Sequence, residues 1–357
     1  MSFSPELKYQ KATVEKILEQ TEIPVDDTVF YLQTIQAVTS KGEPVQLELG
    51  TEFQPLSQAQ TVAAGQEIIV AESATDPAEV IFIDRYRLDP MIFLSLLFLV
   101  VVWLVSRLQG LRAILGIALS LVLLVGVIVP GMLQGINPVA ISVLSAITIG
   151  GISMYLTHGL GKISHLSFAS LVGTLSFVAF LAFGVIQIMG LSGGGSEEAA
   201  FLRVGETATL NLQGLLLGGI ILGTLGVLDD IVVSQVEVVL QLKKAKPSMK
   251  MKELADRALS VGKRHVSSLV NTLVLAYAGT NLPLFLLFSL YNTEPIWVLL
   301  NSEMLAEEII RTLLGSIGLI MSVPITTYLS AWYVSKLSAE ELQEEELDHT
   351  HGHGYSH

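Results

Sequence analysis

Long apolar runs dominate the chain after residue 88, and charged residues are mostly confined to the stretches between them. The runs cover residues 90–105, 113–133, 138–156, 166–190, 212–235, 266–290 and 312–334. About 20 predominantly apolar residues in a helix are enough to cross the hydrocarbon core of a bilayer. The pattern therefore predicts a mainly α polytopic membrane protein with about seven transmembrane helices over residues 89–336.

The first 88 residues follow a different pattern, with short runs rich in β-branched and aromatic residues. These runs cover residues 28–38, 44–49, 66–70 and 79–83. They are separated by Lys41-Gly42, Gly50-Thr51 and Ala64-Gly65, which are typical of turns between strands. We predict a small antiparallel β-barrel or sandwich over residues 1–88, OB-like at best. An acidic, His-rich tail over residues 337–357 completes the expected domain organisation.

Composition supports membrane insertion and narrows the chemistry. The chain is 51% hydrophobic and 15% charged, with a mean hydropathy of +0.60. Its formal net charge of −13 gives no sign of the basic surface that nucleic-acid binding requires. Cysteine is absent, which excludes disulfides, thiol nucleophiles and Cys-based metal sites. Because no hydrolase, nucleotide-binding or zinc-protease motif is present either, we expect neither an enzyme nor an organic cofactor.

The basic residues between the runs indicate an orientation. Arg107 and Arg112 follow the first run, Lys162 follows the third, and a cluster of Lys and Arg between residues 243 and 264 follows the fifth. By the positive-inside rule these stretches are cytoplasmic, so the β-domain is extracytoplasmic and the tail cytoplasmic. Nothing before Lys8 resembles an export signal, so either a preceding segment is missing or the orientation is the reverse.

Two adjacent carboxylates, Asp229 and Asp230, interrupt the fifth apolar run. Carboxylates at membrane depth are costly and tend to be functional. Two neighbouring carboxylates in a low dielectric do not both ionise easily unless a cation or base neutralises them. This pair predicts a proton or small-cation site on the fifth transmembrane helix. The alternative is that the helix leaves the membrane at Leu228 and the aspartates contact lysines of the following loop.

Small residues accompany this pair on one face of the helix. At 100° per residue the stripe contains Gly219, Gly223, Gly226, Asp230 and Ser234. Such stripes permit close helix packing, and the partner helix would then meet Asp230. Gly315 and Gly318 form a comparable face in the last run.

The sixth run supplies further polar residues. Asn271 and Asn281 share a face, and Pro283 interrupts the helix just after Thr280. Broken helices with free carbonyls and Asn or Thr side chains coordinate cations in many transporters. We expect Asn271, Thr280 and Asn281 to complete the site with Ser234 and Gln235; an ordinary proline kink is the alternative.

Two short similarities suggest an internal hairpin repeat. Residues 150–152 resemble 218–220, and residues 170–175 resemble 268–273. A real repeat would give Lys162 and Asp230 equivalent positions, from which they could pair. Chance similarity between apolar sequences is the alternative. In the tail, the weak candidates for divalent-metal binding are His349, His351, His353 and His357, and a solvated tail without metal is the alternative.

Several of these features resemble the YibE/F-like integral membrane proteins of bacteria. They are Asp229-Asp230 followed by Gln235, the glycines at 315 and 318 with Pro324 and Thr326, and a β-domain that ends in residues 84–87. The resemblance implies a bacterial plasma-membrane protein and marks Asp229, Asp230 and Gln235 as a site without naming its ligand. The family pattern also places a hydrophobic segment before the β-domain, and this sequence does not show one.

Together these observations predict an integral membrane transport protein with a carboxylate-centred site for a proton or small cation. The alternative is a non-transporting scaffold or assembly factor that recruits protein partners through the β-domain and the basic loop. Either would have the lipid bilayer as a partner, and either is compatible with an oligomer.

Overall fold

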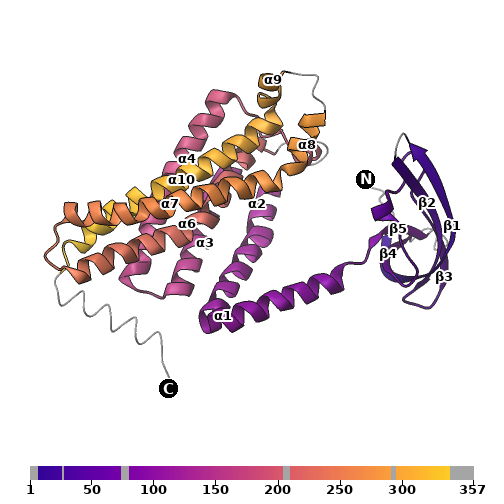
Figure 1. Cartoon of the computed structure of the whole chain (residues 1–357), viewed down its shortest axis with the longest axis horizontal. Coiled ribbons are helices and arrows are strands. Elements are labelled where there is room, and N and C mark those ends of the chain that lie inside the picture. Colours follow the sequence, from indigo (N-terminus) through magenta and orange to yellow (C-terminus); the bar gives the residue numbers. More distant parts are fainter. Residues whose placement is uncertain (1–6, 26–27, 74–79, 204–209, 291–294, 338–357) are drawn as a thin grey trace. The chain divides into compact units, whose positions relative to one another are not determined.

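The computed structural model describes residues 7–25, 28–73, 80–203, 210–290 and 295–337 (Figure 1). The chain divides into two compact units, Met1–Leu104 and Val105–His357. Each has a hydrophobic core of its own. The His-rich tail, with its four candidate histidines, lies outside the described residues.

The first unit contains a curled antiparallel sheet. Its strands are β1 (Leu7–Val25), β2 (Thr28–Thr39), β3 (Pro44–Leu49), β4 (Glu67–Ser73) and β5 (Val80–Arg85), with a short helix η1 (Gln58–Gln60) before β4. The sheet order is β3-β2-β1-β4-β5, and the two edge strands β3 and β5 approach each other. The expected barrel is thus a half-barrel. Strands β2 to β5 match the four predicted strands to within a few residues, whereas β1 was not predicted.

Alternation of side chains builds the core of the half-barrel. The buried positions are two residues apart along each strand, as a one-sided sheet requires. They include Ile35 and Ala37 on β2, Leu47 and Leu49 on β3, and Ile68 and Val70 on β4. Gly42, Gly50 and Gly65 have φ values of 84°, 81° and 85°, which explains why glycine occupies each predicted turn.

Strand β1 is responsible for the curl. It pairs with β4 through Leu7–Thr13 and with β2 from Ala12 to Val25. Its register with β2 shifts between Val14 and Lys16 and again between Ile17 and Glu19. Such bulges bend a strand and increase its twist, so one long strand can join both halves of the sheet.

Helix α1 (Leu88–Leu123) contains two apolar spans. Its backbone is non-helical at Arg107, where φ is 46°. The spans on either side are Leu88–Arg107 and Gly110–Leu133, and the second continues through the π-helical turn η2 (Leu124–Ile128) into α2 (Val129–Leu133).

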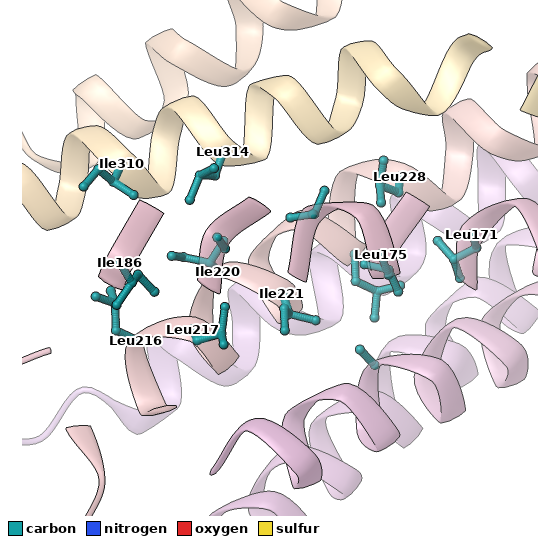
Figure 2. Close-up of a cluster of buried hydrophobic side chains, with 14 of the residues drawn as sticks. Leu171, Leu175, Ile186, Leu216, Leu217, Ile220, Ile221, Leu228, Ile310 and Leu314 are labelled. Carbon is teal, nitrogen blue, oxygen red and sulfur yellow. The ribbon is translucent and has the colours of Figure 1, made fainter. Parts of the chain in front are cut away.

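The second unit is a helical bundle around α6 (Leu212–Ala245). Helix α6 packs against α3 (Pro138–His158), α4 (Lys162–Met189), α7 (Met251–Thr280) and α10 (Glu303–Val334) (Figure 1). The shorter helices are α5 (Glu197–Leu202), α8 (Leu282–Leu290) and α9 (Ile296–Leu300). Figure 2 shows leucine and isoleucine side chains of α4, α6 and α10 in one buried cluster, including Leu175, Ile220 and Leu314.

Six helices of the described chain are long and apolar enough to cross a membrane, whereas seven were expected. The missing one is the run 266–290. Its first part belongs to α7, which begins with the polar residues 251–265, and the helix is interrupted at Asn281 before α8 begins. Pro283 has no N–H to donate to Gly279, which is the physical reason for a break here.

Candidate functional site

Helix α6 carries Asp229 at its middle. The helix has 34 residues, which corresponds to about 51 Å and exceeds the ~30 Å hydrocarbon core. Near the start of α4, Ile163 packs in one cluster with Val236 of α6. Asp229 precedes Val236 by two helical turns, so it lies roughly 10 Å further into the bundle than the first residues of α4. Helix α6 also continues beyond Leu228 as a packed helix, with Val232, Val236 and Val239 buried.

The half-buried carboxylate of Asp229 is held by the neighbouring helix α3. The hydroxyl of Ser153 donates a hydrogen bond to Asp229 Oδ2. Close packing surrounds this contact, because a Cβ at Gly150 would lie 2.3 Å from Leu171 on α4 and 3.2 Å from Leu225 on α6. Helices α3, α4 and α6 therefore pack closely about one turn of α3 away from the Ser153–Asp229 contact, and Ser153 was not predicted.

Asp230 has a different environment from its neighbour. Its side chain is exposed, and a Cβ at Gly226 on the same stripe would meet nothing within 4 Å. Further along the stripe, a Cβ at Gly223 would lie 3.3 Å from the Tyr277 hydroxyl, and one at Gly219 would lie 3.8 Å from Arg311. The close helix approach expected over Gly226 and Asp230 is therefore not found among the described residues.

Close approach occurs instead at the glycines of α10. A Cβ at Gly318 would lie 2.6 Å from Val178 on α4 and 3.0 Å from Thr224 on α6. One at Gly315 would lie 3.9 Å from Leu273 on α7. Helix α10 thus packs most tightly at Gly318, where the small residue lets it approach two helices.

Gln235 connects three helices. Its side chain is buried, and Nε2 donates to the Ala258 carbonyl of α7 at 3.1 Å and to Thr327 Oγ1 of α10 at 2.6 Å. A Cβ at Gly262 would lie 2.7 Å from Gln235 Oε1, so the amide is also held sterically. Ser234, the preceding residue, is half-buried.

The polar residues expected from the sixth run do not gather around Asp229. Asn281 donates to Glu308 Oε2 at 3.1 Å, and Glu308 forms an ion pair with Arg311 at 3.4 Å. Since Arg311 lies beside Gly219, this cluster is about 15 Å along α6 from Asp229. Asn271 and Thr280 are exposed, and Thr280 Oγ1 bonds within its own helix to Ala276.

Lys162 begins α4 and is half-buried. Within the described part of the chain no ion pair joins it to Asp230, so the pairing expected from an internal repeat is not found there.

Buried hydroxyls form a layer that was largely unpredicted, at the end of the bundle where α4 begins and α10 ends. Ser164, Ser167, Ser170 and Thr174 recur every three or four residues on α4, which places them on one face of the helix. On α10 the buried hydroxyls are Ser322, Thr326, Thr327 and Ser330. Among the described residues, the oxygens of Ser164, Ser167, Thr326 and Ser330 have no hydrogen-bond partner. Buried hydroxyls are usually paired, so these could bind water or a cation.

Two further acids lie at the opposite end of α10, and one of them is buried. Glu307 is only 4% exposed and accepts a hydrogen bond from the Gly195 amide at 3.1 Å. Glu303 accepts from the Ser192 amide. Both carboxylates thereby hold the glycine-rich loop between α4 and α5. No group of three or more His, Asp or Glu able to hold a metal occurs in the described residues.

Comparison with known proteins identifies the family to which the helical bundle belongs. The family model described as YibE/F-like protein matches residues 94–336, which includes Asp229, Gln235 and the hydroxyl layer. No curated protein and no solved structure matches the chain. The match covers well over half of the sequence, and the chain therefore belongs to the YibE/F-like family.

Proposed function

We propose that this protein transports a proton or a small cation across the membrane and that Asp229 is the central group of its site. The observation that carries the proposal is the position of this carboxylate: midway along α6, two turns inside the bundle, and bonded to Ser153 of α3. In this proposal the membrane is the bacterial plasma membrane, and the protein catalyses no reaction.

The chemistry of the surroundings supports a small, hard ligand. A carboxylate at membrane depth is costly, and binding of a proton or a cation lowers that cost by neutralising its charge. Such residues are usually kept because they have a function. Hydroxyl oxygens are suitable ligands for hard cations and suitable partners for water. The hydroxyls of Ser164, Ser167, Thr326 and Ser330, which have no partner among the described residues, occupy the same half of the bundle. We assign them to the path between Asp229 and that end of the helices.

The other polar residues take different roles in this proposal. Gln235 is a positioning residue that keeps α6, α7 and α10 together. The Asn281–Glu308–Arg311 cluster is a separate feature near the opposite end. Asp230 is outside the site, because its side chain is exposed on another face of α6.

The test compares the two aspartates, which are a matched pair of adjacent and chemically identical residues. Purified protein in sealed proteoliposomes would be assayed for proton flux with an internal pH-sensitive dye, and for uptake of a panel of monovalent and divalent cations. We expect Asp229→Asn to abolish the flux and Asp230→Asn to keep most of it. Ser153→Ala removes the hydroxyl that positions this carboxylate, so we expect a flux between those of the wild type and Asp229→Asn.

Unchanged helical content and melting temperature would show that each variant is folded. Loss of flux in Asp230→Asn with normal flux in Asp229→Asn would contradict the assignment of the site. Absence of wild-type flux for every ion would favour the scaffold alternative, in which surface changes in the half-barrel or in the basic loop should impair partner recruitment.

A further inference from the structure

A groove of about 750 Å³ lies between α7 and α10, outside the site around Asp229. Helix α7 contributes Leu259, Lys263 and Val270 to its lining, and α10 contributes Ile320, Pro324 and Tyr328. The two helices are antiparallel here, since Gly262 lies against Val323 and Leu273 against Gly315. One end of the groove therefore contains Lys263 and Tyr328, and the other end contains Val270 and Ile320.

The polar end of the groove coincides with a sharp change in the sequence of α7. Residues 250–265 include five basic and two acidic residues, whereas residues 266–290 include no charged residue. In a membrane-spanning chain such a change marks the level of the lipid headgroups. Lys263 lies three residues before it, and Tyr328 is of the type enriched at membrane interfaces. The remainder of the groove extends into the apolar section.

The charge of Lys263 is not neutralised within the described protein, where no carboxylate lies within ion-pair distance of it. The acids that precede Lys263 on α7 are Glu253 and Asp256: Glu253 is paired with Lys246 at 2.9 Å and with Arg257 at 3.2 Å, and no ion pair joins Asp256 to Lys263 among the described residues. The hydrogen bond from Lys246 lowers the pKa of Glu253. Lys263 at the mouth of the apolar groove therefore has no acidic partner among the described residues.

Proline in α10 adds a second polar feature. Pro324 has no N–H, so it cannot donate the helical hydrogen bond to the Ile320 carbonyl, and both residues line the groove. The hydroxyl of Tyr328 lies one turn beyond the proline. An amphiphile with an anionic head, ester oxygens that accept hydrogen bonds and an apolar chain would match this order of groups.

We propose that this groove binds an anionic phospholipid, with its phosphate beside Lys263 and an acyl chain along Val270 and Ile320. Basic pockets between transmembrane helices are a known means of binding anionic headgroups. The site is separate from the ion path, and its occupant would contact both α7 and α10.

The test is native mass spectrometry of the full chain in detergent, titrated with dioleoyl phosphatidylglycerol or with the zwitterionic dioleoyl phosphatidylcholine. We expect the anionic lipid to bind more tightly than the zwitterionic one. Lys263→Gln should weaken binding of phosphatidylglycerol by about fivefold and leave phosphatidylcholine unchanged. The matched control is Lys252→Gln, an exposed lysine of the same helix outside the groove, which should leave both affinities unchanged.

A second variant tests the apolar part. Val270→Trp should fill the groove and weaken the binding of both lipids without changing the oligomeric mass. The proposal is overturned if Lys263→Gln keeps the preference for phosphatidylglycerol, or if Lys252→Gln loses it equally, since the attraction would then belong to the whole basic surface. A change from dimer to monomer in Val270→Trp would also overturn it, because the groove would then be a subunit interface.

Discussion

Asp229 and Asp230 show how strongly one residue of displacement changes an environment on a helix. Successive side chains point about 100° apart, so one carboxylate faces α3 and the other faces away from the bundle. The same rule separates Gln235, which is buried, from Ser234, which is half-buried. The function of a polar residue in this bundle therefore depends on which helix its face meets.

Gln235→Leu is expected to destabilise the protein. The substitution removes the hydrogen bonds to Ala258 and Thr327 and leaves a buried carbonyl without its donor, at a cost of about 1–3 kcal/mol. Thermal unfolding in detergent should show a lower melting temperature. Gln241→Leu is the matched control, since Gln241 is exposed on the same helix. Equal melting temperatures for the two variants would contradict the assigned role of Gln235.

At the scale of elements, the loop between α4 and α5 is defined by its contacts with the start of α10. Gly193 has a φ of 79°, and a Cβ at Gly195 would lie 2.9 Å from the backbone of Glu303 and Met304. The amides of Ser192 and Gly195 donate to Glu303 and Glu307. The glycines thus allow the loop backbone to come close enough to donate hydrogen bonds to both carboxylates, of which Glu307 is buried.

Gly195→Ala should displace this loop from α10. The added methyl group would meet backbone rather than a flexible side chain, and overpacking of this kind costs about 1–3 kcal/mol. Hydrogen exchange followed by mass spectrometry should show faster exchange in residues 192–196. Gly184→Ala on α4, where a Cβ meets nothing within 4 Å, should leave exchange unchanged. Normal protection in Gly195→Ala would show that the loop tolerates the displacement.

At the scale of the whole molecule, two units with separate cores are joined through α1. The half-barrel buries apolar side chains on its inner face, whereas the described chain that follows it contains six apolar spans. The clustering of basic residues between α6 and α7 predicts that this loop is cytoplasmic and that the half-barrel is extracytoplasmic.

Single cysteines would test this orientation, because the chain contains none of its own. Thr51→Cys in the half-barrel and Ser248→Cys between α6 and α7 are both at exposed positions. In intact bacterial cells, a membrane-impermeant maleimide should label Thr51→Cys and should reach Ser248→Cys only after permeabilisation. The opposite pattern would reverse the orientation.

The sequence by itself determined the features that depend on local pattern. The lengths of the apolar runs predicted a polytopic membrane bundle, and alternation with glycine turns located β2, β3, β4 and β5. Local pattern could not reveal β1. Its outer half contains Lys, Glu and Gln on both faces, and its pairing with β4 joins residues about sixty positions apart. The seventh expected span is not confirmed, because the run 266–290 is divided between α7 and α8.

Only the tertiary structure decided which polar residues meet. A helical wheel gives the faces of each helix but not the helix that each face contacts, so Asn281 could not be separated from Asp229 by sequence alone. The contact between Ser153 and Asp229 likewise joins residues that are 76 positions apart. The hydroxyl spacing on α4 was visible in the sequence, but its burial depends on α6 and α10. Packing between helices, rather than the composition of any one helix, determines the site.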